Sequence, residues 1–257
     1  MRIDRPDDGD PVPATPDAPE LRQAGAGAGK VRPASHDTPP EPAGAATRTE
    51  RALQSRAKVD AAYRVADAVD QAYARVCEVE RNTVTPAMRR IEAADPQRHL
   101  AGLEHRVKGR ERLAEKVGFD VAKKGRDVDQ AVSNVKDTIR YTFVYDEAGY
   151  TAGVYSDCDR LQEAGFERFD RRNSWDHDEY KGINTRWRIP GAGQIFEVQF
   201  HTHASLDAKE ETHFTYERIR SMPEDDAEVA ELRAYQREVT AKVPVPPGAV
   251  DIPDYRS

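Results

Sequence analysis

A short alternating segment near residue 200 carries the most chemically active side chains of this sequence. In Phe196–His201 the residues of one parity are apolar, and those of the other are a carboxylate, an amide and an imidazole, from Glu197, Gln199 and His201. Because side chains of a strand alternate between its two faces, the polar groups would line one surface while the apolar ones face a core. Such a row can hold a metal ion or polarise a hydroxyl group. The same pattern also fits an ordinary half-exposed strand.

Basic side chains earlier in the chain have spacings that suit a polyphosphate. Arg106 and Lys108 would share one face of a strand, and Lys108, Arg112 and Lys116 follow one another at four-residue steps, as on one helix face. Positive charges where a strand leads into a helix can bind phosphate groups. A solvated basic face explains the same spacing, and the spacing alone favours that simpler interpretation.

A carboxylate stands before the next β-rich run. Asp137 precedes the run that carries Arg140, and together with Glu197 from another strand it would offer two carboxylates to a divalent cation. Proteins usually hold Mg²⁺ with one or two carboxylates and the phosphates of the substrate, so we expect Mg²⁺ as the cofactor. Further along, a turn at Lys181-Gly182 leads into a basic strand that begins at Asn184.

Polar side chains also share one face of the helix expected after the alternating segment. These residues are Lys209, His213, Tyr216 and Glu217. They either line a site or are simply exposed. A zinc site made by His201, His203 and His213 is an alternative, but their spacing is not that of zinc ligands and a fourth ligand is missing.

The elements that must position these side chains follow an α+β order. We expect strands over 100–108, 138–145, 166–172, 184–190 and 195–202, and helices over 109–124, 150–164 and 205–220. This order predicts a mixed sheet of about five strands flanked by helices, in a domain spanning 97–222. The remainder, 223–257, would form one more helix over 224–241 and a proline-rich end that frays.

Two segments precede this domain. Residues 1–46 are rich in Pro, Ala, Gly and Asp and contain no aromatic residue, which predicts a disordered leader. Residues 47–96 would form a helical extension. In it, Thr47 and Glu50 make a capping box for a helix reaching about Arg81, and Thr85-Pro86 would begin a second, short helix.

Composition narrows the class of protein. Hydrophobic residues make up 38% and charged residues 33%, which is lean for a chain that folds along its whole length. The net charge of -7 does not favour a general nucleic-acid binder, although a local basic groove is compatible with it. The sequence has no apolar run that could span a bilayer and no secretory signal pattern. We therefore expect no membrane insertion and, for the chain as written, a cytoplasmic location.

The motifs from roughly His105 to Tyr216 resemble, in order, the synthetase domain of RelA/SpoT-type enzymes, including small alarmone synthetases and their toxin relatives. The Arg106–Gly109 stretch with Lys116 resembles the ATP-binding R-x-K region, and Asp137–Arg140 the strand with the Mg²⁺-binding aspartate. Tyr180–Thr185 resembles the acceptor-binding turn, Glu197–Gln199 the E-x-Q strand with the catalytic glutamate, and the helix with Glu210, His213 and Tyr216 the segment that follows.

This resemblance implies a nucleotidyltransferase-like fold and a pyrophosphokinase, which moves the β,γ-diphosphate of ATP to a ribose 3'-hydroxyl and leaves AMP. Asp137 and Glu197 would hold Mg²⁺ and act as the catalytic pair. The residues implied in ATP binding are Arg106, Lys108, Lys116 and Arg140. Those implied on the acceptor side are Lys181, Asn184, Gln199, His201, His213 and Tyr216.

The sequence departs from the family mainly on the acceptor side, where Ile183 replaces a stacking aromatic residue and His201 an arginine. Asp137 stands three residues before Arg140, whereas the family's aspartate stands five before its arginine. The acceptor therefore stays open between a purine nucleotide, which would give an alarmone, and the 3'-end of tRNA.

The sequences of Tyr180–Asn184 and Phe196–Thr202 look more like those of domains carried by bacterial polymorphic toxins. That likeness implies a toxin exported into target cells by a specialised secretion system, with an immunity protein as partner, and it allows a homo-oligomer. A catalytically inactive nucleotide-binding or interaction module is the rival from another class.

Overall fold

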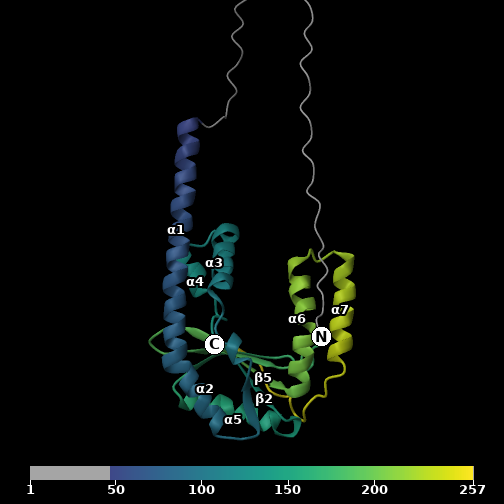
Figure 1. The fold of residues 1–257 in the computed structure, drawn as a ribbon. Helices are drawn as coiled ribbons and strands as arrows, with labels where there is room; N and C mark the ends of the chain where they lie inside the picture. The colour runs from purple at the N-terminus through teal and green to yellow at the C-terminus, as the bar shows by residue number, and fades with distance from the viewer. Residues whose placement is uncertain (1–46, 257) are drawn as a thin grey trace, which may run out of the picture. The chain divides into compact units, whose positions relative to one another are not determined.

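The computed structural model describes residues 47–256, so the predicted disordered leader lies outside the described part. Its centre is a six-stranded mixed sheet in the order β1-β2-β5-β4-β3-β6 (Figure 1). The strands are β1 (Arg98–Ala101), β2 (Arg140–Tyr145), β3 (Glu167–Asn173), β4 (Ile183–Arg188), β5 (Ile195–Thr202) and β6 (Tyr255–Arg256). The helices are α1 (Arg48–Val79), α2 (Thr85–Ala93), α3 (Arg110–Lys124), α4 (Val128–Ser133), α5 (Tyr150–Glu163), α6 (His203–Ser221) and α7 (Ala227–Thr240). The α+β prediction is confirmed, with six strands instead of five.

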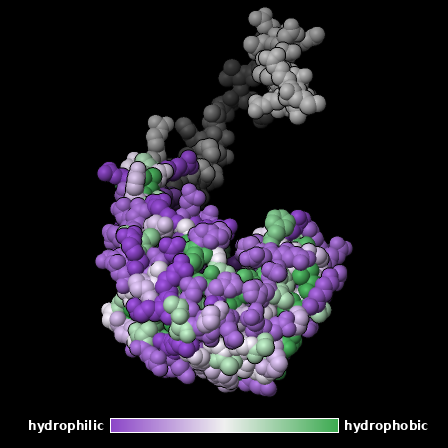
Figure 2. Space-filling model, turned by 60° about the horizontal axis from the view of Figure 1, so that its bottom comes forward, coloured by the Kyte–Doolittle hydropathy of each residue, from purple (hydrophilic) through white to green (hydrophobic). Residues whose placement is uncertain are grey.

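One face of the sheet is the main hydrophobic core. Phe143, Trp187, Phe196, Val198 and Phe200 are all fully buried there. They pack with apolar residues of α2 and α5 in a single cluster. In accord with this burial, hydrophilic residues cover most of the molecular face seen in Figure 2, where apolar residues appear only in small groups. The alternation of β5 therefore has the orientation expected from its sequence, with its apolar parity inward.

A second, smaller hydrophobic core packs α3 and α4 against α1. Val69 of α1, Leu113 and Val117 of α3, and Ala131 of α4 are buried together. The prediction of a helix over 109–124 is confirmed, and Gly125 ends it in the left-handed conformation that favours glycine, at φ 63°. This packing anchors α3, the helix that carries Lys116.

The N-terminal helix begins as predicted but continues further. Thr47 and Glu50 form the capping box of α1. The chain then passes through a π-helical turn over Glu80–Val84 directly into α2. The predicted cap at Thr85 is therefore wrong: its hydroxyl group instead bonds the Glu80 carboxylate and the Tyr141 hydroxyl, tying the helix to β2.

The predicted strand over 100–108 is also wrong for most of its length. β1 ends at Ala101, and Gly102, with φ 60°, turns the chain into a 3-10 helix over Leu103–His105. Only an isolated bridge from Val107 to Ile139 follows. Arg106 and Lys108 consequently lie in irregular backbone and do not share a strand face.

The prediction that the C-terminal segment frays is wrong. Val243, Ala249 and Ile252 are buried in the main core, and the side-chain amide of Asn173 donates hydrogen bonds to the carbonyls of Ala249 and Ile252. The last strand, β6, pairs antiparallel with β3 and supplies the sixth strand of the sheet. Within 47–256, no helix is both long and apolar enough to cross a membrane.

Candidate active site

The register of three adjacent strands builds a polar surface on the sheet face opposite the main core. The pair β2 and β5 is parallel and places Arg140 opposite Glu197. The antiparallel pair β4 and β5 places Arg186 opposite Glu197 and Asn184 opposite Gln199. Residues opposite one another in a sheet point to the same face. The polar parity of β5 thus becomes the middle of a polar surface extending over β2 and β4.

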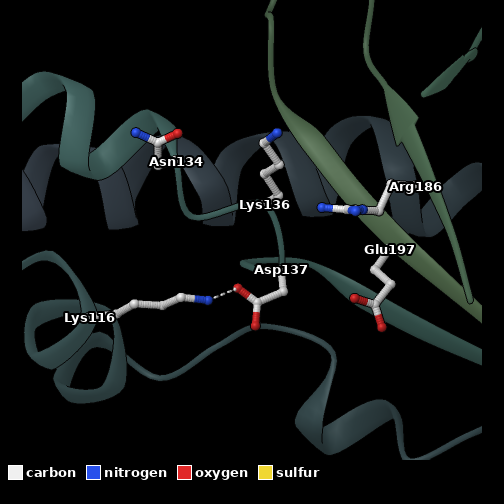
Figure 3. A pocket seen from close by; sticks show the side chains of 6 residues that line it. All are labelled: Lys116, Asn134, Lys136, Asp137, Arg186 and Glu197. Carbon is white, nitrogen blue, oxygen red and sulfur yellow. Dashed lines mark hydrogen bonds and ion pairs between the residues drawn. The ribbon is translucent and has the colours of Figure 1, made fainter. Parts of the chain in front are cut away.

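A pocket of about 250 Å³ opens on this surface, near the first residues of β2 and β5. Its lining residues are Lys116, Asn134, Lys136, Asp137, Arg186 and Glu197. Figure 3 shows the Asp137 and Glu197 carboxylates reaching into it from neighbouring segments. The fold therefore brings together the two carboxylates that the sequence places sixty residues apart.

Asp137 is held by several cations. Its Oδ1 accepts a 2.7 Å hydrogen bond from Nζ of Lys116, and its Oδ2 lies 3.2 Å from Nζ of Lys108 and 3.7 Å from the Arg140 guanidinium. Although burial favours the neutral form, the hydrogen bond from Lys116 and the charge of Lys108 lower the pKa of Asp137 to about 2. The carboxylate is therefore ionised at neutral pH.

Glu197 is oriented through one of its two oxygens. Oε1 accepts hydrogen bonds from Nε of Arg140, at 3.1 Å, and from the Gln199 amide. Among residues 47–256, no side chain donates to Oε2. The other end of the Gln199 amide accepts a 2.7 Å hydrogen bond from Nζ of Lys209. These contacts fix the carboxylate plane while one oxygen stays available to a ligand.

Among the residues bonded around Glu197, Lys209 was not predicted to have a role in the site. The sequence placed it only on the polar face of the helix that is α6. Burial, and then the charge of Arg140, lower the pKa of its ammonium group to about 8. The signal in the sequence was its four-residue spacing from His213. Nothing in that spacing indicated that Lys209 lies against β5 whereas His213 is exposed.

The donor chemistry of the pocket fits a magnesium ion. Mg²⁺ is commonly held by one or two carboxylates with water and substrate phosphates completing its coordination, and Asp137 with Glu197 supplies such a pair. The zinc alternative is wrong, because both ring nitrogens of His201 are engaged, by Tyr180 and by Ser205. Within the described residues, no group of three or more His, Cys, Asp or Glu side chains is arranged to hold a metal.

Arg106 lies apart from these carboxylates. Its Nε donates a 2.6 Å hydrogen bond to Glu80 and its NH1 group one of 2.7 Å to the Leu103 carbonyl. Glu80 also accepts from the Tyr141 hydroxyl. Of the four residues predicted to bind ATP, Lys108, Lys116 and Arg140 surround the Asp137–Glu197 pair, whereas Arg106 is bound to the helix that enters α2.

On the acceptor side, a chain of hydrogen bonds leads from the polar surface into the protein. The Tyr180 hydroxyl donates to Asn184 and is also 3.0 Å from Nε2 of His201, whose Nδ1 is 2.8 Å from the Ser205 hydroxyl. Burial, and then the charge of Lys209, hold the pKa of His201 well below its ordinary value, so the ring is neutral. His201 is fully buried and orients Tyr180 from behind.

The other residues predicted on the acceptor side are partly buried away from the polar surface and partly exposed. Ile183 is fully buried on the core face, whereas the Tyr180 hydroxyl reaches Asn184 on the polar surface. Lys181 donates to the carbonyl of Trp175 instead of a site residue. Tyr216 is 48% exposed and its ring lies 5.5 Å from the Arg220 guanidinium. His213 is exposed on the same helix.

Comparison with known proteins finds no match among protein-family models or curated protein sequences. Solved structures similar to this chain include the type VI effector Tas1 in complex with its immunity protein, at 15% identity and a TM-score of 0.49, covering 69% of this chain and 98% of that one. Small alarmone synthetase 1 from Bacillus subtilis bound to its product pppGpp is 16% identical, with a TM-score of 0.44 and coverage of 66% and 88%. A GTP pyrophosphokinase family protein from Streptococcus pneumoniae is 15% identical, with a TM-score of 0.45 and coverage of 68% and 86%. The similarity concerns the arrangement of helices and strands.

Proposed function

We propose that this protein is an ATP-dependent pyrophosphokinase that transfers the β,γ-diphosphate of ATP to the ribose 3'-hydroxyl of a purine nucleotide. The observation that carries the proposal is the in-register parallel pairing of β2 and β5, which places Glu197 beside Arg140 and in one pocket with Asp137. Two carboxylates surrounded by lysine and arginine suit a metal-bound polyphosphate, since the carboxylates hold the metal and the cations bind phosphate oxygens.

We expect the cationic side chains of the pocket to leave their carboxylate partners and bind phosphate when the ligand enters. Lys108 and Lys116 are paired with Asp137, and Arg140 with Glu197. Asp137 and Glu197 are the residues that would hold Mg²⁺, and a metal ion bound there would supply positive charge next to the phosphates. Lys108, Lys116 and Arg140 can then donate to phosphate oxygens without loss of charge balance.

Glu197 would accept the proton of the attacking hydroxyl group. In the ligand-free structure Oε1 accepts hydrogen bonds from Arg140 and Gln199, whereas Oε2 is the oxygen that can take the proton, provided that the acceptor lies within hydrogen-bond reach. Once Arg140 donates to phosphate, Oε1 would be the oxygen left for the metal. In the reaction a bond forms between the 3'-oxygen and the β-phosphorus of ATP. The bond between that phosphorus and the oxygen bridging it to the α-phosphate breaks, and AMP leaves with the bridging oxygen.

The decisive assay incubates the purified protein with Mg²⁺ and ATP labelled on the γ-phosphate, and offers GDP, GTP, AMP, ADP or bulk tRNA as acceptor. Release of AMP matched by label on one acceptor supports the proposal and identifies that acceptor. Label at the 3'-end of tRNA would replace the nucleotide by tRNA as substrate. Tight binding of ATP without AMP release would favour an inactive nucleotide-binding module.

A variant tests the role of the carboxylate itself. We expect Glu197→Gln to lower transfer by about 10²- to 10⁴-fold, because the amide can neither accept the proton nor hold the metal. Glu115→Gln is the matched control, since Glu115 is exposed on α3 and makes no ion pair within the described residues. Transfer retained in Glu197→Gln, with both variants folded, would refute the assignment.

The biological setting rests on the sequence resemblance. A toxin role, export into target cells, an immunity partner and a homo-oligomer remain predictions of that resemblance. Growth arrest on expression in a bacterium, absent in the Glu197→Gln variant, would support the toxin role.

A further inference from the structure

Phe169 occupies a β-bulge beside the candidate active site. In the pairing of β3 with β4, Arg168 lies opposite Trp187, but Asp170 lies opposite Arg186, so Phe169 is an additional residue in β3. A bulge changes the direction of a side chain, and bulges are frequent next to active sites. Here Phe169 is half-buried and its ring lies among the cations that border the pocket.

Three cationic groups surround that ring. Nζ of Lys136 is 4.6 Å from the ring centre, and the guanidinium carbons of Arg188 and Arg186 are at 5.2 Å and 5.7 Å. These distances are within the range in which the face of an aromatic ring attracts a cation. The ring therefore gathers positive charge at the side of the pocket that Arg186 lines.

Lys136 differs from its neighbours in having no carboxylate partner among the described residues. Arg186 is paired with Asp170, and Lys116, on the other side of the pocket, with Asp137. Lys136 lines the same pocket, where Figure 3 shows it above the Asp137–Glu197 pair. An anion that enters the pocket can bind Lys136 without breaking an existing ion pair.

We propose that Lys136 binds a phosphate group of the ligand in this pocket and that the ring of Phe169 holds its ammonium group in place. The inference rests on the proposed function only for the identity of the ligand, a nucleotide polyphosphate. Phe169 is a positioning residue in this arrangement, because it acts through Lys136.

The test is direct binding of ATP with Mg²⁺, measured by calorimetry on the full chain without any acceptor. Lys136→Met should weaken ATP binding about tenfold, as expected for a lost hydrogen bond to a charged group, and Lys136→Arg should restore most of it. Inorganic tripolyphosphate should lose affinity by a similar factor, since the contact is to phosphate. Lys123→Met, which removes one exposed charge of α3, is the control for a change of net charge alone.

A double-mutant cycle tests the role of the ring. Phe169→Leu keeps an apolar side chain of similar bulk and should weaken ATP binding severalfold. The double variant should bind no more weakly than Lys136→Met alone, because in this proposal the effect of the ring on the ligand passes through the lysine. Additive losses would overturn the role of Phe169, and unchanged ATP affinity in Lys136→Met would overturn the phosphate contact.

This experiment is independent of catalysis. A protein that binds ATP through Lys136 but transfers nothing would retain this inference and lose the proposed function. If wild type and Lys136→Met transfer diphosphate equally well and bind ATP with equal affinity, the proposed function stands and this inference is wrong.

Discussion

Asp137 offers a quantitative test of the cation-rich pocket, because its replacement should lower stability as well as activity. Its pKa falls from 3.8 to about 2, with its side chain only 22% exposed. One pKa unit corresponds to about 1.4 kcal/mol, so the folded protein favours the ionised form by about 2 kcal/mol relative to the unfolded chain. Asp137→Asn keeps the shape and removes the charge that Lys108 and Lys116 contact.

We therefore expect Asp137→Asn to lower the free energy of unfolding by about 2 kcal/mol at pH 7. The pKa is lower in the folded than in the unfolded state, so the ionised carboxylate stabilises the protein fully above about pH 4, and this contribution is lost as pH falls toward 2. The difference between wild type and variant should be constant from pH 7 to 5 and smaller at pH 3.

Urea denaturation at these pH values measures both quantities. Asp67→Asn is the control, since Asp67 is exposed on α1 without an ion pair in the described part, and we expect a change within about 0.5 kcal/mol. If the free energy of unfolding of Asp137→Asn differs from that of wild type by less than this, or by an amount that does not depend on pH, the lysines do not stabilise the ionised carboxylate of Asp137.

Other predictions concern the surroundings of the pocket. The Lys209 ammonium group should titrate near pH 8 in lysine-selective NMR, and loss of its signal in Lys209→Arg would assign it. Because this pKa is below that of a lysine in the unfolded chain, the free energy of unfolding should rise with pH between about 8 and 10.5. Titration of Lys209 above pH 10 would contradict the argument that burial lowers its pKa. Gly182→Ala should cost about 2–4 kcal/mol in urea unfolding, since φ is 148° and a Cβ atom would lie 2.7 Å from Cε1 of His201, whereas Gly118→Ala in open space on α3 should not destabilise. Ile252→Ala should cost about 2–4 kcal/mol because the side chain is 1% exposed; a loss below about 0.5 kcal/mol would mean that the C-terminal segment frays after all.

The parts of the fold that were predictable from sequence are those with a local physical cause. The alternation of Phe196–Thr202 identified the strand and its buried face, since strand geometry repeats every two residues. The capping box at Thr47 likewise located the start of α1. The strand predicted over 100–108 failed because Gly102 turns the chain, a conformation that its side-chain pattern does not encode.

The composition of the site was partly predictable. Glu197, Gln199 and Asp137 stood out by residue type, and the resemblance placed Lys108, Lys116 and Arg140 beside them. Lys136 and Phe169 were not identified, since a bulge in β3 and the position of β4 decide that they meet.

By itself, the sequence determined which side chains each strand and helix presents on each of its faces, because these periodicities depend only on neighbouring residues. Tertiary structure decided which faces meet. Strand order placed β2 beside β5 and so brought Asp137 and Glu197 to one pocket, and α6 brought Lys209 to Gln199 while His201 is buried in its neutral form. These contacts join residues far apart in the chain, and they are selected by the packing of the whole core and by strand register, which no local pattern encodes.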